Sequence, residues 1–181
     1  MSLHADATDV LTRWRPPDDA QAVLRRRYLA HLHERADGLW RECHPDHLTA
    51  STLLLSADRS RVLLTLHRKL RRWLQTGGHC ERDDPTLAAA ARREAVEESG
   101  IAGLTLDEVP VLLSHHEVPC GPLRPAHHLD VQYAAEVADG AVAVASHESA
   151  DLRWFPVRAL PPDTDDSVRA LVHHALSRVR G

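Results

Sequence analysis

The alanine-rich segment at residues 85–99 is the strongest helix in the sequence, and it lies between segments that have strand patterns. Its residues have high helix propensity, a proline stands in its first turn, and Gly100 follows as a stop signal. A helix enclosed by strands on both sides predicts an α/β sandwich. The strand patterns cover residues 48–57, 61–67, 109–118, 127–137 and 151–155.

Two more helices are predicted, one near each end of the chain. The first covers about residues 18–35 and follows a polar arm that ends in two prolines. The second covers residues 164–179, where apolar side chains recur at the spacing of one helix face. The pattern therefore predicts a loose N-terminal arm and helix over residues 1–44 and a main domain over residues 45–181.

Composition excludes several classes of protein. The chain has 22 basic and 26 acidic residues, so its net charge of −4 lacks the positive footprint of a nucleic-acid or anionic-membrane binder. No apolar run approaches the ~18 residues of a membrane span, and the first residues contain no signal-peptide core. The three cysteines are far apart and odd in number, which argues against a disulfide framework. We therefore expect a cytoplasmic protein with neither a nucleic-acid nor a membrane partner.

Three carboxylates are predicted to crowd one face of the central helix. Glu94, Glu97 and Glu98 have the spacing i, i+3 and i+4, at which like charges repel. A hard divalent cation such as Mg²⁺ or Mn²⁺ prefers carboxylate oxygens and cancels this repulsion. Arg93 lies four residues before Glu97 and can hold it by a charged hydrogen bond. On the carboxylates alone, a solvated acidic face is the favoured explanation, as it is for most such charge runs.

The residues around these carboxylates resemble the signature of the Nudix hydrolase family. That signature reads Gly-x5-Glu-x7-Arg-Glu-U-x-Glu-Glu-x-Gly-U, in which U is an apolar residue. Residues 93–101 match its second half, and Gly78 stands at its first glycine. Asp84 replaces the first glutamate, and eight residues rather than seven separate it from Arg93. Residues 77–84 also resemble a Gly-Gly-His-Cys-Glu-Pro-Gly-Asp variant of bacterial Nudix proteins.

This resemblance implies a fold and a reaction. The fold is the Nudix α/β/α sandwich, with a mixed sheet, a central catalytic helix and a C-terminal helix, to which this chain adds an N-terminal helix. The reaction is the hydrolysis of a nucleoside diphosphate linked to another group, by water activated on a divalent metal. The implied partner is a small nucleotide or another diphosphate.

Carried over by position, the resemblance also implies roles for individual residues. Mg²⁺ or Mn²⁺ is expected on the glutamates of the helix and on the carbonyl of Gly77, while Arg93 orients a ligand glutamate. The general base is expected to be Glu94 or Glu98, or a distant loop glutamate, for which Glu148 is the candidate. The expected metal ligands are Gly77, Glu94, Glu97 and Glu98.

Substrate contacts are expected before and within the signature. Arg68, Lys69 and Arg72 belong to a basic stretch just before the signature and can grip phosphate oxygens, although a solvated loop explains them equally well. Gly78 and Glu81, in the signature loop, are also assigned to substrate binding.

Other interpretations of the sequence remain open. A Nudix domain that binds a ligand without turnover is the main alternative, although such a domain is expected to lose the carboxylates. Isomerase chemistry on the same fold needs a reactive cysteine, for which Cys43 is the candidate, whereas Cys80 is expected to be a small apolar filler. The histidine doublets point to opposite faces of strands, so no separate zinc site is expected. The N-terminal helix covers the sheet or forms a homodimer interface.

Overall fold

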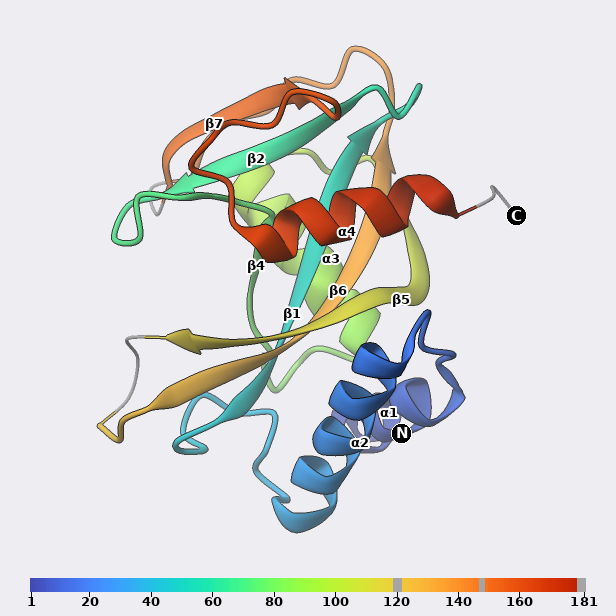
Figure 1. The fold of residues 1–181 in the computed structure, drawn as a ribbon, viewed down its shortest axis with the longest axis vertical. Coiled ribbons are helices and arrows are strands. Elements are labelled where there is room, and N and C mark those ends of the chain that lie inside the picture. Colours follow the sequence, from blue (N-terminus) through green and yellow to red (C-terminus); the bar gives the residue numbers. More distant parts are fainter. Residues whose placement is uncertain (119–121, 147–148, 179–181) are drawn as a thin grey trace.

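A computed structural model of the chain describes residues 1–118, 122–146 and 149–178. The strands in these ranges are β1 (His47–Ser56), β2 (Arg61–His67), β3 (Trp73–Leu74), β4 (Thr76–His79), β5 (Leu104–Val118), β6 (Ala126–Val137) and β7 (Ser149–Pro156). The helices are α1 (Leu3–Arg13), α2 (Asp19–Glu34), α3 (Leu87–Ser99) and α4 (Asp166–Ser177). The predicted central and C-terminal helices are therefore present (Figure 1).

The strands form one mixed sheet with β1 at its centre. Its order is β3-β2-β1-β6-β5, while β4 also pairs with β1 and β7 pairs with β2. β1 and β6 run parallel, with His47 beside His128 at one end and Ser56 beside Val137 at the other. The other strand pairs are antiparallel. Because alternate residues of a strand share a face, this register decides which side chains of β1 and β6 lie together.

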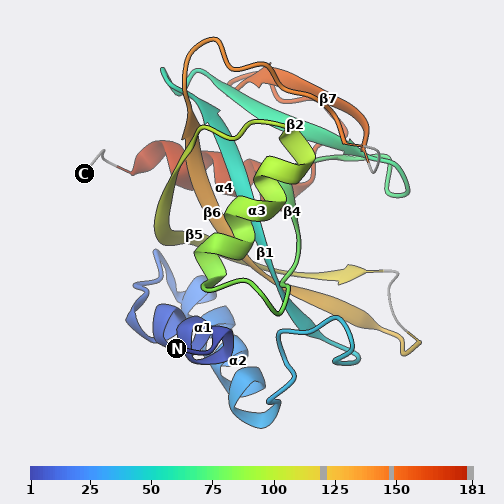
Figure 2. The ribbon, with the colours of Figure 1, turned by 180° about the vertical axis from the view of Figure 1, so that it is seen from behind.

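Helices cover both faces of the sheet. α3 lies on one face with α1 and α2 beside it, and α4 crosses the opposite face (Figures 1 and 2). The side chains of β1 alternate accordingly. Leu48 and Ala50 pack with the alanines of α3, whereas Leu53 and Leu55 pack with the apolar face of α4. The observed fold is thus the predicted α/β/α sandwich.

The ends of the two main helices follow from local side chains. Thr86 accepts a hydrogen bond from the backbone N–H of Ala89 at the start of α3. Gly100 ends α3 at a φ of 70°, in the left-handed region that favours glycine. Asp165 caps α4 by accepting from the N–H of Ser167.

The N-terminal region differs from its prediction, because the expected loose arm contains a helix. α1 begins after Ser2, which caps it, and buries Leu3, Ala7 and Leu11. α1 and α2 share one apolar cluster with α3, β1 and β6. The polarity of the arm masked this helix, since only its narrow apolar face contacts the rest of the protein.

Two short strands, β3 and β4, occupy the stretch that the sequence predicts as a basic loop. β4 pairs with β1, with Thr76 beside Thr52 and His79 beside Thr49. At Gly77 a Cβ atom would lie 2.3 Å from the Cβ of Ser51, so the close approach of the two strands requires glycine there. The short length and the two glycines of β4 do not favour a strand, so its pairing with β1 decides its conformation.

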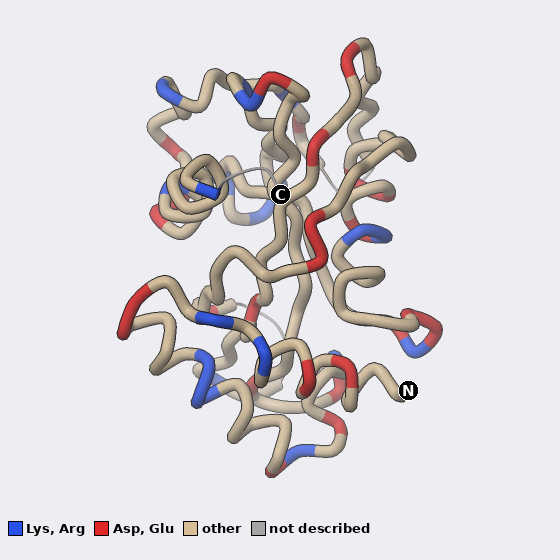
Figure 3. The backbone as a smooth tube through the Cα atoms, turned by 90° about the vertical axis from the view of Figure 1, so that its right-hand side faces the viewer, with Lys and Arg blue, Asp and Glu red and all other residues tan. Residues whose placement is uncertain are grey.

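Charged residues are spread over all parts of the described chain. Lys and Arg are interspersed with Asp and Glu in Figure 3, in keeping with the small net charge of −4. None of the described helices has both the length and the apolar character that a membrane span needs.

Candidate active site

The carboxylates of α3 lie against the two glycines of β4. A Cβ atom on Gly78 would come within 2.6–2.7 Å of the Glu94 carboxylate, so this side chain lies directly over the glycine. The N–H of Gly77 donates to Oε2 of Glu98 at 3.0 Å. Three of the four predicted metal ligands, Gly77, Glu94 and Glu98, are therefore neighbours in space, and Glu97 is on the same helix face.

Arg93 joins the acidic groups of this site. Its Nη1 donates to Oε1 of Glu94 at 3.0 Å and to Oε2 of Glu97 at 3.2 Å. Its Nε and Nη2 form a two-point contact with Asp84, at 3.0 Å each. The bonds to Asp84 are the main reason that the pKa of Arg93 is raised above its usual value, so the guanidinium stays charged. One cation thus offsets the repulsion between the carboxylates.

Asp84 organises the loop that leads into α3. Its side chain is only 6% exposed and accepts from the N–H of Glu81 at 2.7 Å, in addition to the contacts with Arg93. Arg93 also donates to the carbonyl of His79 at 2.9 Å, which ties the loop to β4. Asp84 therefore binds Arg93 despite its shorter side chain and the longer spacing. Glu81 is 66% exposed and lies 3.8 Å from Arg93.

The basic residues assigned to substrate lie in the turn between β2 and β3, and all three are exposed. Arg68 donates to the carbonyl of Ser149 at 3.1 Å, and Arg72 pairs with Asp165 at 2.9 Å. Within the described ranges, no hydrogen bond or ion pair in the structure joins Arg68, Lys69 or Arg72 to α3. Their phosphate contacts stay a prediction. Glu148, the distant candidate base, lies outside the described residues.

A strip of polar side chains crosses the sheet face opposite α3, and sequence reasoning missed it. Asp130 of β6 is buried and accepts from Thr49 at 3.0 Å and from Ser51 at 2.7 Å, both on β1. Gln75 donates to Ser51 at 3.2 Å. The sequence did contain a sign of this strip, because polar residues occupy every second position at the start of both strands. Which of these residues contact one another depends on the β1–β6 register, which the sequence does not show.

Some of the histidines lie close together in two groups, which the sequence also did not predict. His47, His79 and His128 form one group, whereas His115 and His127 form the other with Asp46. The doublet at 127 and 128 is divided between the groups, as expected from the alternation of side chains along a strand. The ligands of the first group come from three strands, so no sequence spacing could show them together.

The two described cysteines, Cys43 and Cys80, are buried free thiols. Cys80 is buried, and burial raises the pKa of its thiol to about 12, as expected for an apolar filler. Cys43 is also buried, and burial is the main cause of its raised pKa. A protonated, buried thiol does not support the isomerase interpretation. Cys120 lies outside the described residues.

Comparison with known proteins then identifies the family. The model of the NUDIX domain matches residues 45–175, which is most of the chain. The chain belongs to the Nudix family. The resemblance of residues 93–101 to the Nudix signature is therefore confirmed. No curated protein matches the chain.

Solved Nudix structures share the fold of this chain at low sequence identity. A NUDIX-family hydrolase from Clostridium perfringens is 24% identical, with a TM-score of 0.54, over 73% of this chain and 98% of the other. An Ap4A hydrolase from C. elegans is 17% identical, with a TM-score of 0.58, over 72% and 95%. The E. coli dihydroneopterin triphosphate pyrophosphohydrolase is 20% identical, with a TM-score of 0.59, over 70% and 92%. At these identities the likeness concerns the fold.

Proposed function

We propose that this Nudix protein is an active hydrolase that cleaves the diphosphate bond of a nucleoside diphosphate linked to another group. The observation that carries the proposal is the carboxylate cluster of α3 lying over Gly77 and Gly78, with Arg93 bound to Glu94 and Glu97. A domain that only binds a ligand has no need for three carboxylates held together against their repulsion.

The donor set of this cluster fits Mg²⁺ or Mn²⁺. Glu94, Glu97 and Glu98 offer carboxylate oxygens, which hard divalent cations prefer, and the carbonyl of Gly77 is the fourth proposed ligand. The backbone N–H at Gly77 already fixes one oxygen of Glu98. When bound, such an ion neutralises phosphate charge and makes a water molecule easier to deprotonate.

The protein's own residues position the groups and accept the proton. Nη1 of Arg93 holds Glu94 and Glu97 in place, while Asp84 in turn fixes the guanidinium through Nε and Nη2. Glu94 or Glu98 serves as the general base, since a carboxylate fixed beside the substrate can take a proton from the attacking water. Glu148 is the alternative base on a loop.

Phosphate recognition is assigned to the turn between β2 and β3 and to the signature loop. Lys69 and the neighbouring arginines can supply positive charge to phosphate oxygens. Gly78 and Glu81 are the proposed contacts of the loop: Gly78 leaves room for the Glu94 carboxylate, and Glu81 lies at the exposed edge.

The names of the fold relatives suggest which diphosphates to test. They include hydrolases of Ap4A and of dihydroneopterin triphosphate, and a NUDIX domain from Shewanella oneidensis NrtR in complex with ADP ribose. Each of these compounds contains phosphates joined to one another, and Ap4A and ADP ribose are of the class proposed for this chain.

Phosphate release, coupled to pyrophosphatase and phosphatase, tests the proposal. The panel contains nucleoside triphosphates, ADP-ribose, NADH, dinucleoside polyphosphates and nucleotide sugars, each with Mg²⁺ and with Mn²⁺. We expect turnover of one class, which Glu98→Gln reduces by at least about 100-fold because it removes a metal ligand or base. Glu108→Gln, an equal change at an exposed glutamate of β5, is the control.

Two results would contradict the proposal. Full activity in Glu98→Gln would exclude the carboxylate site as the catalytic centre. Tight binding of a nucleotide with no turnover across the panel would favour the ligand-binding domain instead.

A further inference from the structure

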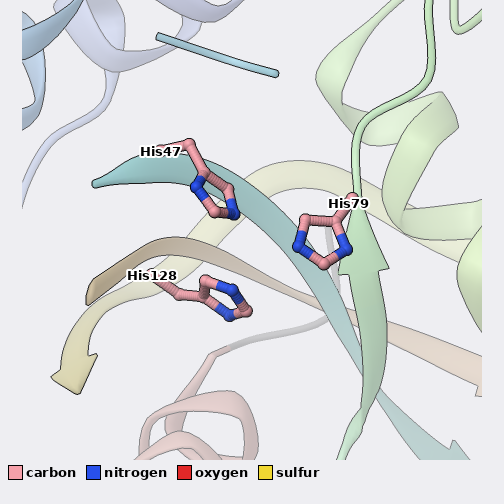
Figure 4. A group of neighbouring side chains, drawn as sticks. All are labelled: His47, His79 and His128. Carbon is pink, nitrogen blue, oxygen red and sulfur yellow. The ribbon is translucent and has the colours of Figure 1, made fainter. Parts of the chain in front are cut away.

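Three histidine rings face one another on the sheet face opposite α3. His47 begins β1, His79 ends β4, and His128 lies near the start of β6. The ring centroids are 5.1 Å apart for His47 and His79, 4.9 Å for His47 and His128, and 5.2 Å for His79 and His128. Figure 4 shows the three rings turned toward a common centre. One nitrogen of each ring lies within 4.8 Å of those of the other two.

Two nitrogens of this group are buried without a hydrogen-bond partner. They are Nε2 of His47 and Nε2 of His79, and the whole side chain of His47 is 0% exposed. Nδ1 of His47 lies 3.2 Å from the carbonyl of Cys43. A carbonyl only accepts, so Nδ1 carries the hydrogen and Nε2 has a free lone pair. Metal-bound histidines have this arrangement, with the second ring nitrogen held by a carbonyl or carboxylate.

The second histidine group provides a contrast. Its His127 donates Nδ1 to Asp46 at 3.0 Å, and the rings of His115 and His127 stack at 4.4 Å. A carboxylate partner and ring stacking account for the position of His127. In the first group, Nε2 of His47 and Nε2 of His79 have no such partner among the described residues, and the rings are tilted or edge-on rather than stacked.

We propose that His47, His79 and His128 bind one transition-metal ion of the Zn²⁺ type. Imidazole nitrogen suits Zn²⁺ and its transition-metal neighbours, whereas Mg²⁺ prefers oxygen. Zn–N bonds of about 2.0–2.1 Å place the nitrogens of a tetrahedral site about 3.3 Å apart, so the rings close slightly on binding. Three protein ligands leave a fourth position for water or for a substrate atom.

This site is separate from the carboxylates of α3. Consecutive side chains on a strand point to opposite faces, and Glu94 lies over Gly78. His79 therefore points away from α3, toward the face that it shares with Thr49. The zinc site and the proposed magnesium site lie on opposite sides of β4, so the proposal does not depend on catalytic activity.

Zinc binding by the full-length protein tests the proposal directly. The protein is treated with a chelator, dialysed, and titrated with Zn²⁺ against a chromophoric competitor, with Mg²⁺ in excess to fill oxygen sites. We expect one Zn²⁺ per chain with a submicromolar Kd. His79→Gln and His128→Gln should weaken binding by more than ~100-fold, which exceeds the usual cost of losing a supporting residue. His115→Gln, in the second histidine group, is the matched control.

Thermal unfolding and one further variant make the result decisive. Zn²⁺ should raise the Tm of the parent protein and of His115→Gln but not that of His79→Gln, with all three folded in the absence of metal. Glu98→Gln should bind Zn²⁺ as the parent does. Unchanged affinity in both His79→Gln and His128→Gln, loss of binding in Glu98→Gln, or no binding by the parent would each overturn the proposal.

Discussion

At the scale of single residues, the carboxylate site depends on glycines as well as on glutamates. Gly77 permits the close approach of β4 to β1 and donates its N–H to Glu98. Gly78 leaves space for the carboxylate of Glu94, which a side chain would occupy. The two glycines therefore allow a strand and a helix to meet where the acidic groups converge.

Gly78→Ala tests this dependence. The new Cβ would lie 2.6–2.7 Å from the Glu94 carboxylate, which is the flexible end of a side chain and so moves away. We expect kcat/KM to fall at least tenfold, or about 1.4 kcal/mol of transition-state stabilisation, with little change in Tm. Gly103→Ala, where a Cβ has no neighbour within 4 Å, is the control. Equal activities for the two variants would show that Glu94 does not need this position.

At the scale of elements, α3 is held in place by residues from outside it. Asp84 and His79 bind Arg93, which lies in the middle of the helix. Asp6 of α1 accepts from the N–H of Leu87 at 2.7 Å, so a residue of the N-terminal region satisfies a donor in the first turn of α3. The position of the carboxylates thus depends on contacts with a separate helix.

Asp6→Ala should destabilise the protein through α3. Loss of the contact leaves the N–H of Leu87 without its partner, and loss of such a cap costs about 0.5–2 kcal/mol of unfolding free energy. Asp9→Ala makes the same change in the same helix, but removes only an exposed ion pair with Arg13, which is worth about 0–1 kcal/mol. Denaturant unfolding of both variants measures the difference. Similar losses for the two would show that Asp6 does not cap α3.

At the scale of the whole molecule, the N-terminal helices complete the core. Leu11 of α1 and Tyr28 and Leu32 of α2 are buried in the cluster that contains α3, β1 and β6. The hydroxyl of Tyr28 donates to the carbonyl of Ser114 on β5 at 2.8 Å. These helices cover apolar surface of the Nudix sandwich, which the sequence offered as one of two roles for the region.

Leu11→Ala is expected to lower the free energy of unfolding by about 2–5 kcal/mol, because it opens a cavity beside a fully buried side chain. Val23→Ala, at a position 54% exposed, should change it by no more than about 0.5 kcal/mol. Denaturant unfolding of the two variants and of the parent protein measures both changes in the free energy of unfolding. A chain without residues 1–44 that keeps the parent Tm would show that residues 45–181 fold independently.

Local sequence patterns by themselves determined the main helices and most of the sheet. Helix propensity with its boundary residues predicted α3, and apolar periodicity predicted α4. Strand-like segments predicted β1, β2, β5, β6 and β7, with clear alternation in β5 and β6. The Nudix resemblance was also readable along the chain, because Gly78 and the whole of residues 93–101 match the signature. These features depend on residues a few positions apart, so they are readable along the chain.

Tertiary structure decided the features that depend on residues far apart in the chain. β4 is a strand because β1 pairs with it, and α1 is ordered because its narrow apolar face finds the core. The parallel register of β1 and β6 brings Asp130 to Thr49 and His128 to His47. No local pattern encodes such pairings, since they arise from long-range packing, and the histidine group therefore became visible only in the folded protein.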